Sequence, residues 1–163
     1  MRIRKGNPAD IREMQLLFVD TVKNVCITDY NSEQIDVWAS GIENLKRWQD
    51  ILTKQFVLIA YDNEKITGFC TLKNGHYIDM LYIHKDYQRQ GIAFKLFTSI
   101  EIEAKRLRQT QLVSDVSITA KPFFEKVGFR ITRAFRPQMG QSFSCRKHLH
   151  LRVPIPELRH SSG

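Results

Sequence analysis

Residues 77–97 combine three features whose order could bind an anion. Residues 78–83 form an apolar run rich in β-branched and aromatic side chains, which is typical of a buried strand. A polar loop follows at 84–90, and from Gly91 apolar residues recur at three- and four-residue steps, as on one face of a helix. The first turn of a helix has backbone N–H groups without intrahelical partners, and glycine lets a phosphate approach them closely. The pattern therefore predicts a phosphate site, although strand–glycine–helix junctions also occur where nothing binds.

Side chains in the same segment add polar chemistry. Gln88, Arg89 and Gln90 supply further hydrogen-bond donors in the loop, and the arginine is permanently charged. The sequence thus predicts both backbone and side-chain donors for one anion.

Asp79 lies in the middle of the apolar strand, where a carboxylate costs free energy unless it is paired or functional. Two roles remain open: a general base, or a structural partner of a nearby arginine or of the backbone. His76 and His84 flank the strand and are weaker candidates for proton transfer. Regular alternation along the strand places the Asp79 side chain on one face with Tyr77, Leu81 and Ile83.

Two motifs resemble those of the GNAT superfamily of acyl-CoA-dependent N-acyltransferases. Residues 88–93, Gln-Arg-Gln-Gly-Ile-Ala, match the Gln/Arg-x-x-Gly-x-Gly/Ala motif of that family. Residues 116–129 resemble its later segment, a strand end, a short helix and aromatic-Glu-Lys-x-Gly-Phe. The two motifs lie in the family's order and at its separation. Within the superfamily, residues 76–81 and 117–125 are similar to the YafP-like bacterial acetyltransferases.

The resemblance implies that acetyl-CoA binds between the fourth and fifth strands. Backbone groups of Leu81, Tyr82 and Ile83 would bind the pantetheine arm, with the Leu81 amide at the thioester carbonyl oxygen. The second motif implies coenzyme contacts from Ser117, Phe123 and Phe124. The pyrophosphate would bind N–H groups of the first motif, which are those of Gln88, Arg89, Gln90, Gly91, Ile92 and Ala93.

The resemblance also implies the reaction and the side from which its second substrate enters. A primary amine of a small molecule or a peptide would attack the thioester directly in a ternary complex, after a base removes its proton. One wall of the acceptor pocket would come from residues 28–52. Aromatic residues in such a segment are often ordinary core, and that alternative stays open. The candidate acceptor contacts are Tyr30, Trp38, Trp48, His76, Tyr77 and Asp79.

Phe124 departs from the family pattern. The family often has a tyrosine at this position, whose hydroxyl protonates the leaving thiolate, and phenylalanine has no proton to give. Ser117, Tyr82, Tyr30 or Cys145 could serve instead, or water alone, since the reference pKa of a thiol is only ~8.5. The departure keeps a second hypothesis open, an acyl-CoA-binding regulatory or degenerate module without turnover.

The length of 163 residues predicts a single domain, which we place at 1–153, followed by a frayed tail at 154–163, and the succession of strands and helices predicts the α/β (mixed α+β) class. Helices are predicted to begin near Asn7, at Asn31 or Ser32, at Gly91, and at Ser117 or Thr119, while 42–52 is helical or irregular. A right-handed crossover would set the fifth strand parallel to the fourth. This order resembles that of GNAT proteins, a mixed central sheet of about seven strands with helices on both faces. The predicted strands are 2–5, 56–61, 66–73, 78–83, 111–116, 129–133 and 143–151.

Composition narrows the classes of function. The net charge is +8, yet no basic run of five residues and no RNA-binding motif occurs, so we expect an anionic coenzyme and no nucleic-acid partner. No apolar run reaches membrane-spanning length and no signal-peptide pattern opens the chain, so we expect a cytoplasmic protein without membrane contact. Cys26, Cys70 and Cys145 have neither disulfide nor zinc spacing, and no metal is expected. The sequence leaves monomer and homodimer open.

Overall fold

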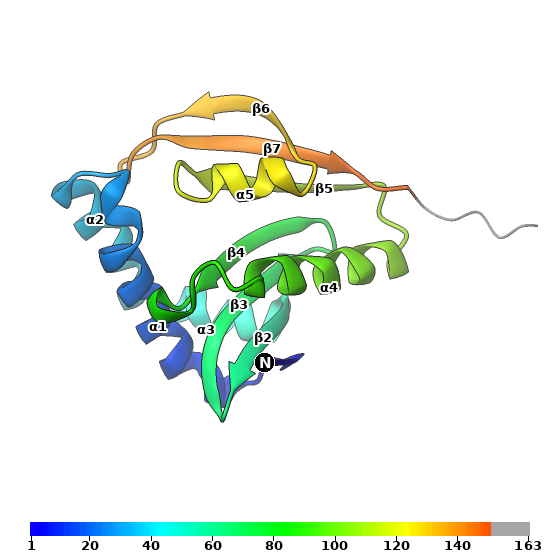
Figure 1. Cartoon of the computed structure of the whole chain (residues 1–163), viewed down its shortest axis with the longest axis horizontal. Helices are drawn as coiled ribbons and strands as arrows, with labels where there is room; N and C mark the ends of the chain where they lie inside the picture. Colours follow the sequence, from blue (N-terminus) through cyan, green and yellow to red (C-terminus); the bar gives the residue numbers. More distant parts are fainter. Residues whose placement is uncertain (151–163) are drawn as a thin grey trace, which may run out of the picture.

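The structure of the chain is a computed structural model that describes residues 1–150 (Figure 1). The predicted tail at 154–163 and the predicted last residue of the seventh strand lie outside the described residues. Four 3-10 turns, η1 (Pro8–Asp10), η2 (Cys26–Thr28), η3 (Ser40–Glu43) and η4 (Lys85–Tyr87), join the other elements. In chain order these are β1 (Arg2–Lys5), α1 (Ile11–Asn24), α2 (Ser32–Ala39), α3 (Leu45–Lys54), β2 (Phe56–Asp62), β3 (Lys65–Lys73), β4 (Tyr77–Ile83), α4 (Ile92–Arg106), β5 (Gln111–Ser117), α5 (Lys121–Lys126), β6 (Arg130–Phe135) and β7 (Ser142–His148).

Asparagine side chains cap the 3-10 turn η1, which leads directly into α1, and the helices α2 and α3. Asn7 accepts a hydrogen bond from the backbone of Ala9, and the Asp10 carboxylate accepts one from Asn7 in return. Asn31 caps α2 in the same reciprocal way, and Asn44 accepts from the first turn of α3. Each cap satisfies N–H groups that the helix cannot. The residue types therefore fix where the helices begin, as the sequence predicts for the first two.

All seven strands form one mixed sheet in the order β1-β2-β3-β4-β5-β7-β6. Strands β1 to β4 are antiparallel neighbours, and β5 is parallel to β4, as a right-handed crossover through α4 requires. The β4–β5 ladder holds only two residue pairs, Tyr77 with Val113 and Ile78 with Ser114. Beyond Ile78 the two strands separate, and this separation creates the site.

Two hydrophobic cores cover opposite faces of the sheet. The α1 core packs α1, α2 and α3 on one face of β2, β3 and β4, around side chains such as Met14, Trp48 and Phe69. The α4 core packs α4 and α5 on the other face and extends under β5 and β7, around Leu96, Leu112 and Phe124. The predicted mixed sheet with helices on both faces is confirmed. Across residues 1–150, none of the helices is both long and apolar enough to span a membrane.

A β-bulge interrupts β4 at Asp79. The β3 partner of Met80 is Thr71 and that of Ile78 is Leu72, so Asp79 has no partner on β3. Leu81 and Ile83 pack against the α4 core, whereas the Asp79 side chain reaches α3 and Gln55, the residue between α3 and β2. The expectation that Asp79 shares a face with Leu81 and Ile83 is therefore wrong, because one extra residue in the strand shifts the alternation.

Candidate active site

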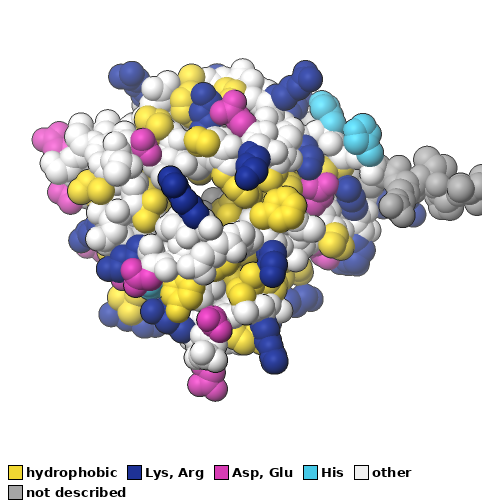
Figure 2. All heavy atoms as spheres, in the orientation of Figure 1, with side chains coloured by type: hydrophobic (Ala, Val, Ile, Leu, Met, Phe, Trp, Pro, Cys, Tyr) yellow, Lys and Arg dark blue, Asp and Glu magenta, His cyan; other side chains and the backbone are white. Residues whose placement is uncertain are grey.

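A cavity of about 1010 Å³ opens where β4 and β5 separate. Its lining comes from β4, β5, α5, the turn before α4, and parts of α1 to α3. Most lining side chains are apolar or aromatic, and Figure 2 shows hydrophobic side chains gathered near the middle of one face among scattered Lys and Arg. Concave, mostly apolar sites with a few polar groups are the usual form of a ligand site. The charged residues of the lining are Arg47, Asp79, Arg89, Asp115 and Lys126.

The turn between η4 and α4 presents backbone N–H groups to this cavity. Arg89 and Gly91 both have left-handed backbone angles, with φ of 58° and 79°. A Cβ on Gly91 would meet no atom within 4 Å, so the space beside its backbone is open. Within residues 1–150, no hydrogen bond is donated by the backbone of 89–94. The turn therefore offers the unpaired donors and the access that a diphosphate needs.

The side chains of this turn differ in their roles. The Gln88 amide donates to the Ile83 carbonyl at 2.7 Å, so it braces the turn against the end of β4. Arg89 lines the cavity, whereas Gln90 is not part of the lining. Ile92 and Ala93 line it at the start of α4. Of the three residues with predicted side-chain donors, Gln88 and Arg89 thus line the cavity, and the Gln88 amide is already engaged with backbone carbonyls.

The edge of β4 that faces β5 is open beyond Ile78. The His84 N–H donates to the Thr67 carbonyl, and hydrogen bonds alternate along an antiparallel ladder, so the backbone groups of Leu81 and Ile83 point away from β3. The Ile83 carbonyl already accepts from Thr21 and Gln88. The N–H and C=O of Leu81 and the N–H of Ile83 remain for a ligand that lies along β4, which is where the resemblance expects the pantetheine arm.

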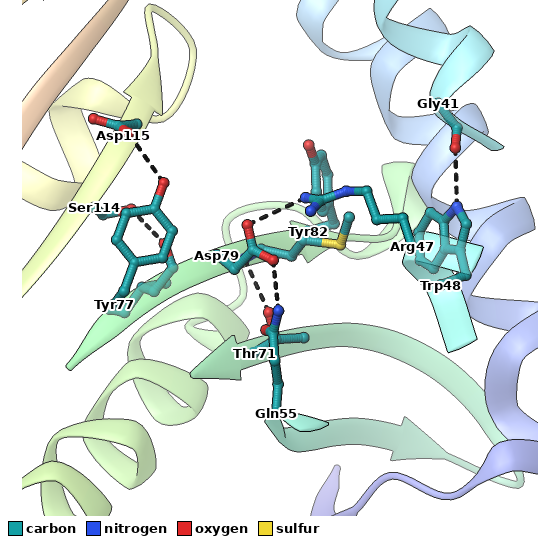
Figure 3. Close-up of polar contacts among 12 residues, drawn as sticks. Gly41, Arg47, Trp48, Gln55, Thr71, Tyr77, Asp79, Tyr82, Ser114 and Asp115 are labelled. Atoms are coloured by element: carbon teal, nitrogen blue, oxygen red, sulfur yellow. Dashed lines mark hydrogen bonds and ion pairs between the residues drawn. The ribbon is translucent and has the colours of Figure 1, made fainter. Parts of the chain in front are cut away.

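Asp79 is held by two residues that the sequence did not single out (Figure 3). Its Oδ1 accepts from Arg47 of α3 at 3.1 Å, and its Oδ2 accepts from the Gln55 amide at 2.8 Å. The Asp79 side chain is 11% exposed and the Arg47 side chain 45%. The structural pairing with an arginine that the sequence leaves open is therefore present, and Asp79 lines the cavity as well.

A second polar group lies across the gap, on β5. The Tyr77 hydroxyl donates to Oδ2 of Asp115 at 3.0 Å, and the Ser144 hydroxyl donates to Oδ1 at 2.7 Å. Burial and the neighbouring Asp115 carboxylate raise the pKa of Tyr77 above its ordinary value, so this hydroxyl stays protonated. Figure 3 shows Tyr77 between the two carboxylates, Asp79 and Asp115.

The predicted aromatic contacts lie in the cavity wall, and each is held in place. Tyr30 donates to the Gln141 carbonyl and accepts from the Ile118 N–H, so it joins the loop before β7 to the end of β5. The Trp38 indole donates to the Tyr82 hydroxyl at 3.1 Å. Trp48 is 1% exposed and donates to the Gly41 carbonyl. These residues line the cavity and also pack in the α1 core. An aromatic side chain here can therefore be both an ordinary core residue and a candidate acceptor contact.

The candidate proton donors for the leaving thiolate differ in whether they line the cavity. Phe124 is 2% exposed and packs edge-to-face on Phe129, with part of it in the cavity wall. Ser117 and Tyr82 line the cavity. Burial raises the pKa of Tyr82 above its ordinary value, so its hydroxyl carries a proton at neutral pH. Cys145 lies in the α4 core outside the lining, and burial raises the pKa of its thiol to about 12.

Some predicted residues lie elsewhere, and some lining residues were missed. His76 precedes β4 beside the Asn74 carbonyl and does not line the cavity; His84 is likewise outside the lining. Phe123 lines it from α5. Arg47, Gln55 and Asp115 could not be found from local patterns, because they meet the site only through contacts between distant segments. Within residues 1–150, no group of three or more His, Cys, Asp and Glu side chains could hold a metal ion.

Comparisons with known proteins agree with this geometry. Residues 26–143 match the family model described as an acetyltransferase (GNAT) domain. The chain is 35% identical over 136 residues to the uncharacterized N-acetyltransferase YafP of Escherichia coli K12, which is 83% of this chain and 85% of YafP. A GCN5-related N-acetyltransferase from Rhodopseudomonas palustris superposes with a TM-score of 0.85 at 28% identity, over 91% of this chain and 95% of the other.

The fold is shared more widely. The PaiA N-acetyltransferase of Thermoplasma acidophilum, solved in complex with coenzyme A, has a TM-score of 0.76 at 20% identity, over 91% of this chain and 98% of PaiA. The matched family segment spans most of the chain, and the YafP likeness covers most of both proteins. The chain therefore belongs to the GNAT family of N-acetyltransferases.

Proposed function

We propose that the protein transfers the acetyl group of acetyl-CoA to a primary amine of a small molecule or a peptide, in the cytoplasm, by direct attack within a ternary complex. One observation carries the proposal: within residues 1–150, unpaired backbone donors at Arg89 and 91–94 and the unpaired edge of β4 line the same cavity. The first set fits a diphosphate and the second fits an amide-containing arm. Solved relatives in complex with coenzyme A or acetyl-CoA support the choice of co-substrate.

The residues present fit the diphosphate and the pantetheine arm of the coenzyme. The open space beside Gly91 admits a phosphate to the N–H groups, and Arg89 adds a positive charge. Leu81 and Ile83 offer N–H groups to the arm, and Phe123 an apolar contact. When bound, acetyl-CoA supplies an acyl group activated as a thioester. The Leu81 N–H is the donor that we assign to the thioester oxygen, where negative charge develops during attack.

The amine must lose a proton before it attacks. We propose Asp79 as the acceptor of that proton, through water, because it lines the cavity on the side of the aromatic wall. Both of its oxygens already accept one hydrogen bond, and a carboxylate has about four lone-pair sites, so sites for water remain. Arg47 and Gln55 fix its orientation. The Tyr82 hydroxyl and Ser117 are the groups in the lining that we assign to the thiolate, with water as the further source of its proton.

One observation favours a second candidate function, a module that binds acyl-CoA without turnover. Phe124 stands where the family often has its acid, and it is buried against Phe129. We favour turnover because a thiol with a reference pKa of ~8.5 leaves readily without an acid.

Calorimetry with CoA, together with a free-thiol assay over a panel of primary amines, tests the proposal. We expect CoA to bind and acetyl-CoA to release thiol with at least one amine, and Asp79→Asn to reduce kcat without weakening CoA binding. The binding module would be supported if CoA binds, no amine releases thiol, and Asp79→Asn gives the same results as the parent protein in both assays. No CoA binding would overturn both candidates.

A further inference from the structure

The outer face of β5, β7 and β6 carries arginines that no helix covers. Cross-strand pairing places Arg130 directly opposite Arg146, and Arg133 opposite Ser144, the residue two before Arg146. Directly paired residues point to the same side of a sheet, so these three arginines share one face. Their partners on β5 are Val113 and Asp115, whereas Leu112, Ser114 and Val116 face the α4 core. We name the surface formed by Arg130, Arg133 and Arg146 the arginine face.

This face is open in the described part of the chain. The α1 core includes strand residues from β2, β3 and β4, and the α4 core lies on the opposite side of β5 and β7. Figure 1 shows β6 and β7 at the top of the molecule, with α5 beneath them. All three arginines are exposed. None of them forms an ion pair or donates a side-chain hydrogen bond within residues 1–150; Arg133 only stacks on Phe135.

The pairing of Arg130 with Arg146 lowers the stability of the folded protein. Like charges directly opposite on neighbouring strands repel each other, and here no carboxylate within 4 Å compensates them among the described residues. An anion above the face would relieve this repulsion. A second copy of the same face would not, because a two-fold contact would bring the two sets of arginines together.

The arginine face continues into the cavity. Phe135 at the end of β6 is paired with Ser142 at the start of β7, and both line the cavity, as does Asp115 of β5. Strands lie about 4.8 Å apart, so the gap beside β5 is roughly 5 to 15 Å from the arginines. An extended chain rises about 3.3 Å per residue and covers this distance in about two to five residues.

We propose that the arginine face docks an acidic polypeptide segment that carries the acceptor amine, with acidic side chains about two to five residues from that amine. This rests on the proposed function and selects the peptide among its acceptors. Asp115 sits between the arginines and the gap, where it suits an ammonium and repels a phosphate backbone. A polypeptide has both charges at the required spacing, and a nucleic acid has no ammonium.

Three peptides of equal length with a single free amine, the N-terminus, test the proposal. They carry Glu, Gln or Arg at positions three to five. We expect kcat/KM for the Glu peptide to exceed that for the Gln peptide by about tenfold at low salt, mainly through KM, because several exposed pairs add up. The Arg peptide should be the poorest. In R130Q/R146Q the Glu-to-Gln ratio should fall to about one, whereas R12Q/K23Q, which removes two exposed charges from α1, should keep it.

Binding gives a readout that does not depend on turnover. An N-acetylated Glu peptide should bind the CoA-saturated protein in calorimetry, and R130Q/R146Q should lose this binding. If the Glu peptide binds in this arginine-dependent way but no peptide or amine releases thiol, the docking proposal is supported and the proposed function is refuted. If thiol is released without preference for Glu, the docking proposal alone is overturned. Displacement of the Glu peptide by duplex DNA at physiological salt, or a homodimer that R130Q/R146Q dissociates, would overturn it as well.

Discussion

Replacing Gly91 with alanine separates the effect of the turn at 88–91 on folding stability from its effect on CoA binding. Gly91 has φ of 79°, and an alanine there costs ~1–2 kcal/mol of backbone strain. A Cβ at this position meets nothing within 4 Å, so no clash adds to the strain in the free protein. We expect the Tm of Gly91→Ala to fall by a few degrees, since ~1 kcal/mol shifts a domain of this size by roughly 2–4 °C.

The effect on CoA should be larger than the effect on folding. The new methyl group would occupy the space from which an anion reaches the backbone donors. Losing one charge-assisted hydrogen bond costs ~1.5–3 kcal/mol, which raises the Kd for CoA by roughly 10- to 100-fold. Calorimetry with CoA, beside thermal unfolding without ligand, measures the two effects separately.

Gly75→Ala is the matched control. Gly75 has φ of 77°, lies in the turn between β3 and β4, and does not line the cavity. The same backbone strain applies, and the new Cβ 3.1 Å from Leu107 adds crowding, so the variant should lose at least as much stability yet bind CoA as the parent does. Equal CoA affinity of Gly91→Ala and the parent protein would refute the assignment of the turn to the diphosphate.

Three further changes probe other parts of the site and fold. In Asp79→Asn, kcat should fall at least ~100-fold while CoA affinity is kept, and a kcat close to that of the parent in a thiol-release assay would leave Asp79 a structural role alone. Phe124→Tyr should raise kcat if its hydroxyl reaches the thiol; because Phe124 is 2% exposed, an unpartnered hydroxyl would instead lower stability by ~1–3 kcal/mol with kcat unchanged. The Arg4 guanidinium, bonded to both oxygens of Asp10 at 2.8 Å, holds the pKa of Asp10 below its ordinary value. The unfolded chain therefore binds the proton first, and the stability that Asp10 adds is present above the unfolded pKa of ~3.9 and lost as pH falls through the folded pKa. Chemical denaturation of Asp10→Asn should show a deficit at pH 6 that shrinks toward pH 2, and a deficit independent of pH would contradict this origin.

Local patterns were enough to predict the order of the strands and the glycine turn before α4, whereas 42–52, which contains most of α3, was predicted only as helical or irregular. That this turn binds an anion stays a prediction. The helix caps, the glycine at the start of α4 and the apolar periods each act over a few residues, so they can be read without knowing the fold. The parallel placement of β5 followed from the handedness of a crossover, which is a general rule. The frayed tail at 154–163 remains a prediction, because it lies outside the described residues.

The contacts of Asp79 could not be predicted in the same way. The bulge in β4 shifts the faces of the residues around it, and no residue type at 78–80 marks it. Arg47 and Gln55 lie 32 and 24 residues before Asp79 in the chain, so only the assembled fold brings them together. Tyr30 shows the same limit, because its hydroxyl joins backbone groups 88 and 111 residues away.

The short β4–β5 ladder is a weak junction between the two halves of the sheet. Among the described residues, the ladder pairs only two residues of each strand, and side chains of α4 and α5 pack across the gap from one face. The stabilisation from apolar packing weakens on cooling, and strands held by long hydrogen-bonded ladders depend less on that packing. Amide exchange along the unpaired edge should therefore accelerate, relative to β2 and β3, as the temperature drops toward freezing. A molecule that bridges both strands would remove that cold sensitivity.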